Sequence, residues 1–440
     1  MRARLRWIWS RLDANYWFYP AMFVVLAAAL GITGTALDRA GWGEQLAENF
    51  HFLAATPQSA QTMLSIIASS MIGVAATVFS ITIAAVAFAS GTYGPRLMTN
   101  FLEDRGNQLS LATLIGTFVY ALTVLASVRG SGEEPVSSGA ASLAEGSNGF
   151  VPQLSLLGAY ALSALAVGVI VYLLNHIPSS IRINHVLEDI GRRLVFDIRE
   201  RYPRAAAGEE PDPAAPGDPL VATRTGYVQM IEFDGLAKWA RDEGYRLALK
   251  VRTGDFVHPG MALALVAAEQ QADDAARKLE EHMSFGAVRT PKQDPQFLID
   301  ELVEIGLRAL SPGINDPFTA ITALHWLGAA TAELGQRNLV KQVGVVDDER
   351  YVWPLPDDFA HFLARGFGAI RSAVAASPIA ARVMLETLAN AREAIPDAAR
   401  CGQLSEEAGR LMEQARLLLA GPDLAIVTER HAALFPPPRS

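Results

Sequence analysis

The residues whose types and spacing could do chemistry lie in the second half of the 440-residue chain. Asp300, Glu304 and Arg308 recur at every fourth position, which places them on one face of a helix. Carboxylates on one face, beside a polar turn, could supply oxygen ligands to a divalent cation. The same row is also typical of a solvated face whose neighbouring charges pair. We favour the second interpretation and expect no metal site.

Histidine and cysteine form no recognisable catalytic or metal-binding pattern. Cys401 is the single cysteine, so no intramolecular disulfide can form, and the chain has no P-loop, GxGxxG, GxSxG or HExxH motif. His176 and His185 lie too far apart on a helix to share a ligand. His325 lies among apolar residues, as a core or interface histidine does. We therefore expect neither enzymatic activity nor a cofactor.

Four uncharged apolar stretches dominate the first half of the chain. Each is long enough to cross a hydrocarbon core about 30 Å thick, and they cover residues 17–36, 62–90, 108–128 and 153–175. The second is too long for a perpendicular span, so it must tilt or project. Residues 1–176 are therefore predicted to form a transmembrane domain of four helices, with the lipid bilayer as its partner.

The flanking charges predict the orientation of these helices. Basic residues precede the first span and follow the fourth: Arg2, Arg4, Arg6, Arg11, Arg182, Arg192 and Arg193. The first and third loops are acidic by comparison. Basic flanks stay on the cytoplasmic side, so we expect both termini in the cytoplasm. The net charge of −9 argues against a nucleic-acid partner, which needs a basic face.

Small residues recur along the second span at helical spacing: Ser69, Gly73, Thr77 and Ser80. The fourth span carries Ser155, Ala159 and Ser163 in a similar pattern. Small side chains let helix backbones approach closely. The pattern favours packing inside one bundle; the alternative is a self-association face or a hydroxyl-lined pore.

The connection between the second and third spans contains Arg96, Asp104 and Arg105 behind helix-breaking glycine and proline. One interpretation is a solvated hairpin with surface charges. The other is a charged cytoplasmic mouth, or a docking surface for the soluble half.

An amphipathic helix is expected to leave the membrane over residues 177–202, because its apolar residues form one stripe. It could pack on its own domain or on a neighbouring subunit. Residues 203–218 are rich in proline, alanine and glycine, which predicts a linker.

The remaining chain is predicted to be an α+β cytoplasmic region. In residues 219–268 apolar and polar residues alternate between glycine- and proline-containing turns, which predicts a small β-rich module. It resembles the turn-rich half of a lipoyl-type barrel-sandwich hybrid. The lysine between two methionines that carries the cofactor in such domains is missing, so we expect a structural module. Residues 269–440 read as a helical domain, in which Asn315, Asp316 and Pro317 form a turn and helix cap.

Two stretches carry a family resemblance. They are FSITIAAVAFASGTYGPRLMTNFLEDRGNQLSLATLIGTFVYAL and RTPKQDPQFLIDELVEIGLRALSPGINDPFTA. Both resemble the predicted membrane proteins grouped as domain of unknown function 2254. The resemblance implies a bacterial inner-membrane protein whose membrane and soluble halves form one unit, and it brings no catalytic residues.

Two functions fit these features. The first is a homo-oligomeric channel or pore, with the second span near the axis and a cytoplasmic regulatory domain. The second is a non-conducting scaffold or sensor, whose cytoplasmic domain binds a partner protein or a small ligand. The lack of charge within the spans argues against a proton-coupled transporter.

Overall fold

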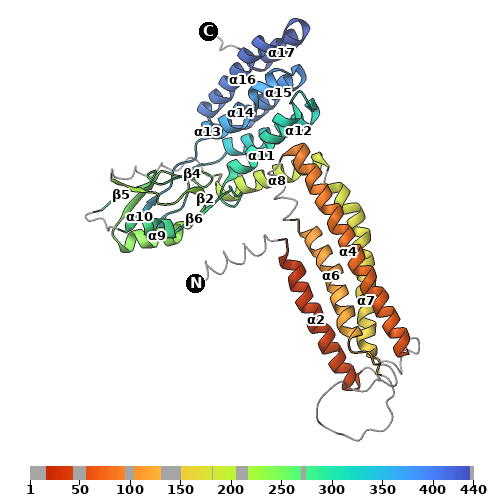
Figure 1. Ribbon diagram of the computed structural model, residues 1–440. Helices are drawn as coiled ribbons and strands as arrows, with labels where there is room; N and C mark the ends of the chain where they lie inside the picture. Colours follow the sequence, from red (N-terminus) through yellow and green to blue (C-terminus); the bar gives the residue numbers. More distant parts are fainter. Residues whose placement is uncertain are drawn as a thin grey trace, which may run out of the picture. The chain divides into compact units, whose positions relative to one another are not determined.

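The computed structural model describes residues 16–42, 56–94, 104–129, 150–180, 182–204, 217–268 and 274–436. The chain forms two compact units, Met1–Arg182 and Ile183–Ser440. The first is a bundle of long helices, and the second combines strands with further helices (Figure 1). The expected order of apolar helices followed by a mixed α/β region and more helices is confirmed.

Four helices of the first unit are long and apolar enough to cross a membrane: α2 (Phe18–Arg39), α4 (Pro57–Tyr93), α6 (Arg105–Leu125) and α7 (Gln153–Ser180). They coincide with the four predicted spans. The 37 residues of α4 extend over about 55 Å at 1.5 Å per residue. This helix is therefore much longer than the hydrocarbon core is thick.

Helix α6 is the inner helix of the bundle. It packs against α2, α4 and α7, and Figure 1 shows it between α2 and the other two. In its apolar window 56% of the residues are buried, against 17% to 28% in the other three helices. Large parts of α2, α4 and α7 therefore face outward, as expected of helices in lipid.

A close approach between α6 and α7 is built around Tyr120. Its hydroxyl donates to the carbonyl oxygen of Ser155 at 3.0 Å. A Cβ atom on Gly158 would collide with that hydroxyl, so glycine is required there. Ser155 and Ala159 are buried at the same contact. Ser155 and Ala159 of the fourth span thus pack within the bundle, whereas Gly168 is exposed.

Asp38, near the end of α2, caps the beginning of α7. Its carboxylate accepts from the Leu154 amide at 2.8 Å, the Ser155 amide at 3.0 Å and the Ser155 hydroxyl at 2.6 Å. The residue is only 7% exposed. The first amides of a helix have no partner within the helix, and an acid there also complements the helix dipole. Asp38 therefore joins two helices more than a hundred residues apart in the chain.

We expect Asp38→Ala to destabilise the bundle by about 1–2 kcal/mol, because a lost helix cap costs that much. The measurement is the apparent unfolding temperature of the purified protein in detergent. The unfolding temperature of Asp38→Asn should lie between those of Asp38→Ala and the wild type, because the amide side chain keeps one oxygen that can accept. Asp423→Ala, at an exposed acid in the first turn of another helix, is the control. An Asp38→Ala protein that unfolds at the wild-type temperature would contradict the assigned role.

The second unit begins with α8 (Ile183–Arg201), whose buried stripe packs against two helices of the same unit, α11 (Pro295–Ala309) and α12 (Pro317–Gly335). Gly191 allows this contact, because a Cβ there would overlap the indole of Trp326. The amphipathic helix therefore packs on its own unit. It differs from the predicted 177–202 helix at its start, since residues 177–180 still belong to α7.

Two sheets share one hydrophobic core with α9 (Phe233–Asp242) and α10 (Ala275–Glu281). The first has the order β1-β5-β3-β9, with β1 Asp218–Val221, β5 Ala262–Ala267, β3 Arg246–Leu249 and β9 Val352–Trp353. The second has the order β4-β2-β6, with β4 Phe256–Val257, β2 Gly226–Ile231 and β6 Met283–Gly286.

All strand pairs in these two sheets are antiparallel except β3 with β9. The described strands close no barrel, so the β-rich part is present while the barrel-sandwich likeness is not established. Two strands, β6 and β9, come from beyond the predicted 219–268 module. The sheets are therefore completed by segments that the local pattern could not include.

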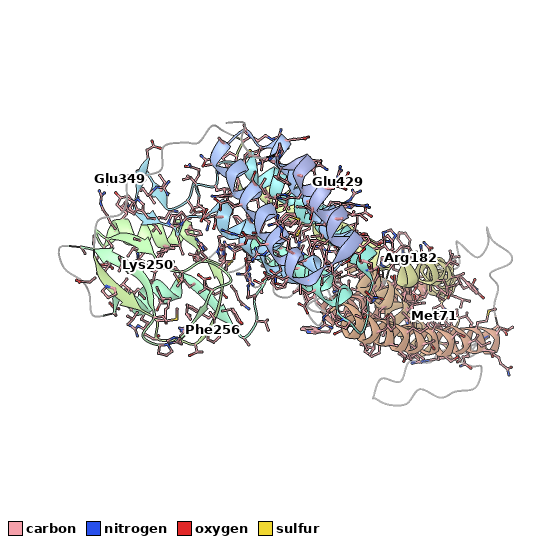
Figure 2. All side chains as sticks on the ribbon, turned by 90° about the horizontal axis from the view of Figure 1, so that it is seen from above. Met71, Arg182, Lys250, Phe256, Glu349 and Glu429 are labelled. Carbon is pink, nitrogen blue, oxygen red and sulfur yellow. The ribbon has the colours of Figure 1, made fainter. Side chains whose placement is uncertain are left out.

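Helices make up the rest of the unit. Besides α11 and α12 they are α13 (Phe359–Leu363), a π-helical turn (Ala364–Gly368), α14 (Ala369–Ala375), α15 (Pro378–Ala394), α16 (Ala398–Leu418) and α17 (Gly421–Leu434). A short hairpin, β7 (Val345–Val346) with β8 (Glu349–Arg350), precedes them. The β-rich part around Lys250 and the C-terminal helices around Glu429 lie side by side within this unit (Figure 2).

Candidate functional site

The small residues predicted on the second span lie on the exposed side of α4. Ser69, Gly73, Thr77 and Ser80 are all exposed. The side that packs on the bundle is formed by other residues: Leu64, Ala68, Met71, Ala75, Val78, Thr82 and Val86. At 3.6 residues per turn the small residues lie about half a turn away from these. This face therefore packs on no other described helix, unlike Ser155 and Ala159 of α7.

The hydroxyl groups on the exposed face of α4 already donate hydrogen bonds within the helix. Each of the three hydroxyls donates to the carbonyl four residues earlier in the helix: Ser69 at 2.8 Å, Thr77 at 3.0 Å and Ser80 at 2.9 Å. A Cβ atom added to Gly73 would meet nothing within 4 Å. The hydroxyl oxygens keep lone pairs that can accept from a partner or from water.

Further small exposed residues extend this face, namely Thr62, Ala84 and Ala87, and Ile66 interrupts it. Large exposed apolar residues lie toward the flanks of the helix: Met63, Ile72, Phe79, Ile81, Ile83 and Phe88. We call the set Ser69, Gly73, Thr77, Ser80 and Ala84 the α4 small-residue face. A second helix could approach there more closely than at the flanks.

The predicted mouth residues take different roles. Arg96 lies outside the described residues, and Arg105 is exposed at the start of α6. Asp104 caps α6 by accepting from the Gly106 amide at 2.9 Å. Its other oxygen lies 2.6 Å from Nε2 of His176 in α7. Asp104 is thus a capping residue that connects two helices, a contact that the local sequence pattern did not indicate.

His176 is held in place from two sides. Besides Asp104, the ring of Tyr172 stacks on it with 4.8 Å between ring centroids. A Cβ on Gly106 would collide with the Tyr172 hydroxyl, so glycine leaves the room for this arrangement. The bundle therefore has a capping aspartate at each end: Asp38 on α7 and Asp104 on α6.

In the second unit, Asn315, Asp316 and Pro317 form a turn and cap between α11 and α12. Asn315 has a φ of 51°, which asparagine tolerates better than most residues. Asp316 accepts from the amides of Phe318 and Thr319 and from the Thr319 hydroxyl. The Thr319 hydroxyl, more than the amides, lowers the pKa of Asp316 below its ordinary value. The motif has a structural role in this arrangement.

The row of charges on α11 takes part in ion pairs. Arg365 contacts both oxygens of Asp300 at 2.6 Å, and Arg289 bridges Asp300 and Asp294. Burial raises the pKa of Asp294, although Arg289 acts in the opposite direction. In the described part of the chain, no group of three His, Cys, Asp or Glu residues could hold a metal ion.

His325 was expected in the core or at an interface. It is exposed on α12, so its placement in the core was wrong.

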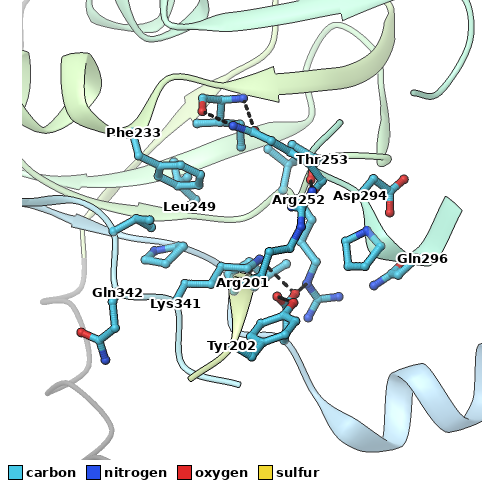
Figure 3. Close-up of a pocket in the computed structure, with 18 of the residues that line it drawn as sticks. Arg201, Tyr202, Phe233, Leu249, Arg252, Thr253, Asp294, Gln296, Lys341 and Gln342 are labelled. Carbon is cyan, nitrogen blue, oxygen red and sulfur yellow. Dashed lines mark hydrogen bonds and ion pairs between the residues drawn. The ribbon is translucent and has the colours of Figure 1, made fainter. Parts of the chain in front are cut away.

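A cavity of about 500 Å³ lies within the second unit (Figure 3). It forms where the end of α8, the ends of β2 and β3 and the start of α11 meet residues 341–343 and 354–357. Part of its wall is apolar, with Ile231, Phe233, Leu249 and Val251. This volume is in the range of small-molecule binding sites.

The polar wall of the cavity is centred on Asp357, whose side chain is 5% exposed. One carboxylate oxygen accepts from the Tyr202 hydroxyl at 2.5 Å. The other lies 2.9 Å from Lys341 Nζ and 3.6 Å from Arg252 Nε. Burial, followed by the nearby Asp357 charge, raises the pKa of Tyr202 well above its ordinary value, so the phenol remains a donor.

Sequence reasoning missed this cavity. Tyr202, Arg252, Lys341 and Asp357 come from four separate segments, and none belongs to a recognisable motif. Lys341 lies in an extended stretch between two helices, a local pattern that by itself indicates no site. Its partners are set by the tertiary fold and not by spacing.

Comparison with known proteins places the chain in a family. The model of the family described as "Predicted membrane protein (DUF2254)" matches residues 13–390. An uncharacterized protein of Mycobacterium tuberculosis is 27% identical over 468 residues, which cover 100% of this chain and 85% of the relative. An uncharacterized protein of Mycobacterium bovis matches to the same extent. No solved structure matches the chain. With four candidate membrane spans and a family match over most of its length, this chain belongs to the DUF2254 family of predicted membrane proteins.

Proposed function

We propose that this protein assembles into a homo-oligomeric channel or pore through the α4 small-residue face, with α4 near the axis. The observation that carries the proposal is that these residues are exposed on the side of α4 opposite to its bundle contact. In the same unit, Ser155, Gly158 and Ala159 of α7 are used for close helix packing. The face on α4 offers the same surface and has no partner helix among those described.

The physics of lipid supports this use of the face. Apolar side chains gain little by leaving lipid for another helix, so association depends on close van der Waals packing and hydrogen bonds. Small residues let the backbones approach closely, and the hydroxyl oxygens, which donate within α4, keep lone pairs that can accept. Around an axis, the same hydroxyls from several subunits would line a neutral, weakly polar path. The predicted spans 17–36, 62–90, 108–128 and 153–175 carry no charged residue, which fits a pore better than a proton relay.

Cross-linking tests the assembly. The single native cysteine permits a cysteine-free background through Cys401→Ser. In that background, Gly73→Cys should form covalent dimers when membrane vesicles are oxidised. Gly168→Cys is the matched control, because Gly168 is also an exposed glycine without neighbours, on α7. Equal cross-linking at both positions would show that α4 has no special place in the assembly.

Conduction tests the pore. Purified wild-type protein in planar bilayers should pass current in potassium chloride, and Gly73→Leu should lose most of it, because a large side chain on α4 blocks close packing or the path itself. Gly168→Leu makes the same change on α7 and should conduct like the wild type. A wild-type protein that forms oligomers yet passes no current would end the pore proposal.

We also propose that both termini and the second unit lie in the cytoplasm of a bacterium, with the bundle in the inner membrane. The basic residues before the first span and after the fourth support this orientation. A fluorescent protein fused after Ser440 should mature and fluoresce, whereas alkaline phosphatase fused there should be inactive. The reverse pattern would place the second unit in the periplasm.

A second candidate function is a non-conducting membrane anchor whose cytoplasmic domain acts as a sensor or scaffold. The charged cavity of the second unit favours it, because such a cavity can hold a small ligand.

A further inference from the structure

The cavity of the second unit has an unusual distribution of charge. Three cations line it, Arg201, Arg252 and Lys341. Asp294, one of its three acids, is already paired with Arg289. Two carboxylates, Asp357 and the exposed Glu200, then face the three cations. The cavity therefore keeps a net positive character at its polar end.

The cations are only partly satisfied by the protein. Lys341 and Arg252 share one oxygen of Asp357, at 2.9 Å and 3.6 Å, and each also donates to one backbone carbonyl, of Leu355 and Pro356 respectively. The Nε atom of Arg252 is buried and makes no hydrogen bond in the structure. A buried donor without a partner is costly, and a guanidinium is suited to a carboxylate or phosphate. An anion entering here would gain a donor that the protein leaves open.

The opposite wall suits the rest of a ligand. Phe233 and Leu249 lie together on one side of the cavity, apart from Tyr202 (Figure 3). Val251, Val343 and Leu355 add further apolar surface. Apolar walls with a few convergent polar groups are typical of small-molecule sites. An inorganic ion alone would leave this surface and most of the volume unused.

We propose that this cavity binds a small organic anion, with its carboxylate or phosphate group against Arg252 and Lys341 and its apolar body against Phe233 and Leu249. The proposed site lies within the second unit, and its ability to bind an anion does not depend on whether α4 forms a pore. Asp357 acts as the internal competitor, because it occupies the two cations when the cavity contains no anion.

Calorimetric titration of the full-length protein in detergent tests the site with three probes of similar size. Benzoate carries a carboxylate, phenyl phosphate carries a phosphate, and benzamide is the neutral analogue. Saturable binding of at least one anion, well above that of benzamide, is expected, and the stronger anion identifies the head group. If neither anion binds better than benzamide, the proposal is overturned.

Variants connect the binding to the named residues. Lys341→Met and Arg252→Met should each weaken binding about tenfold, as expected for the loss of one charge-assisted contact. Lys238→Met, at an exposed lysine on α9, should bind like the wild type. Val343→Trp fills the cavity and leaves every charge in place, so it should abolish binding; unchanged binding in this variant would overturn the proposal.

Asp357→Asn separates a ligand site from a purely structural ion pair. The amide can still accept from Tyr202, but it releases Lys341 and Arg252. Binding of the anion should therefore tighten, even if the protein becomes less stable. Weaker binding in a folded Asp357→Asn protein would show that Asp357 supports the site and does not compete for it, which would overturn the assigned roles.

Discussion

The membrane unit depends on carboxylates that accept from the unpaired backbone amides at the first turn of two of its helices. In lipid every backbone amide needs a partner within the protein, and the first turn of each helix lacks one. Asp38 supplies it for α7 and Asp104 for α6, in each case through direct hydrogen bonds to backbone amides. Both acids also contact a second helix, through Asp38's own place on α2 and through His176 on α7. The charges of this unit thus close the bundle at its two ends and leave the apolar length between them free of charge.

A bundle closed in this way determines which surfaces remain open. Helix α6 packs against α2, α4 and α7, and Gly158 on α7 makes room for Tyr120 of α6. One apolar side of helix α4 packs against the bundle, and the α4 small-residue face points outward. Large residues such as Phe88 and Ile81 on its flanks suit lipid chains, whereas glycine and serine gain little from lipid and more from a second helix. The outward face is therefore the feature of the membrane unit that its own folding does not account for.

The sequence predicted those parts of the fold that depend on local pattern. Length and lack of charge indicated the four spans, and the Asp316-Pro317 pair indicated where α12 begins. Contacts between segments that lie far apart in the chain could not be predicted from local sequence patterns. Asp38 lies just beyond the predicted first span, and its partners at residues 154 and 155 are far away in the chain. Strand β9 likewise joins β3 across more than a hundred residues. The direction in which Ser69 and Gly73 point also depends on which side α6 occupies, which periodicity alone cannot give.

The cavity of the second unit lies at the C-terminal end of α8, the helix that follows α7 in the chain. Helix α8 begins at Ile183, directly after the first unit, and its last turn brings Arg201 and then Tyr202 to the cavity wall. A buried stripe along α8 packs against α11 and α12. Tyr202 is buried and bonded to Asp357, the residue that an entering anion would displace from Lys341 and Arg252. An anion in the proposed site would therefore lie against the last residues of α8, the helix that follows α7 in the chain.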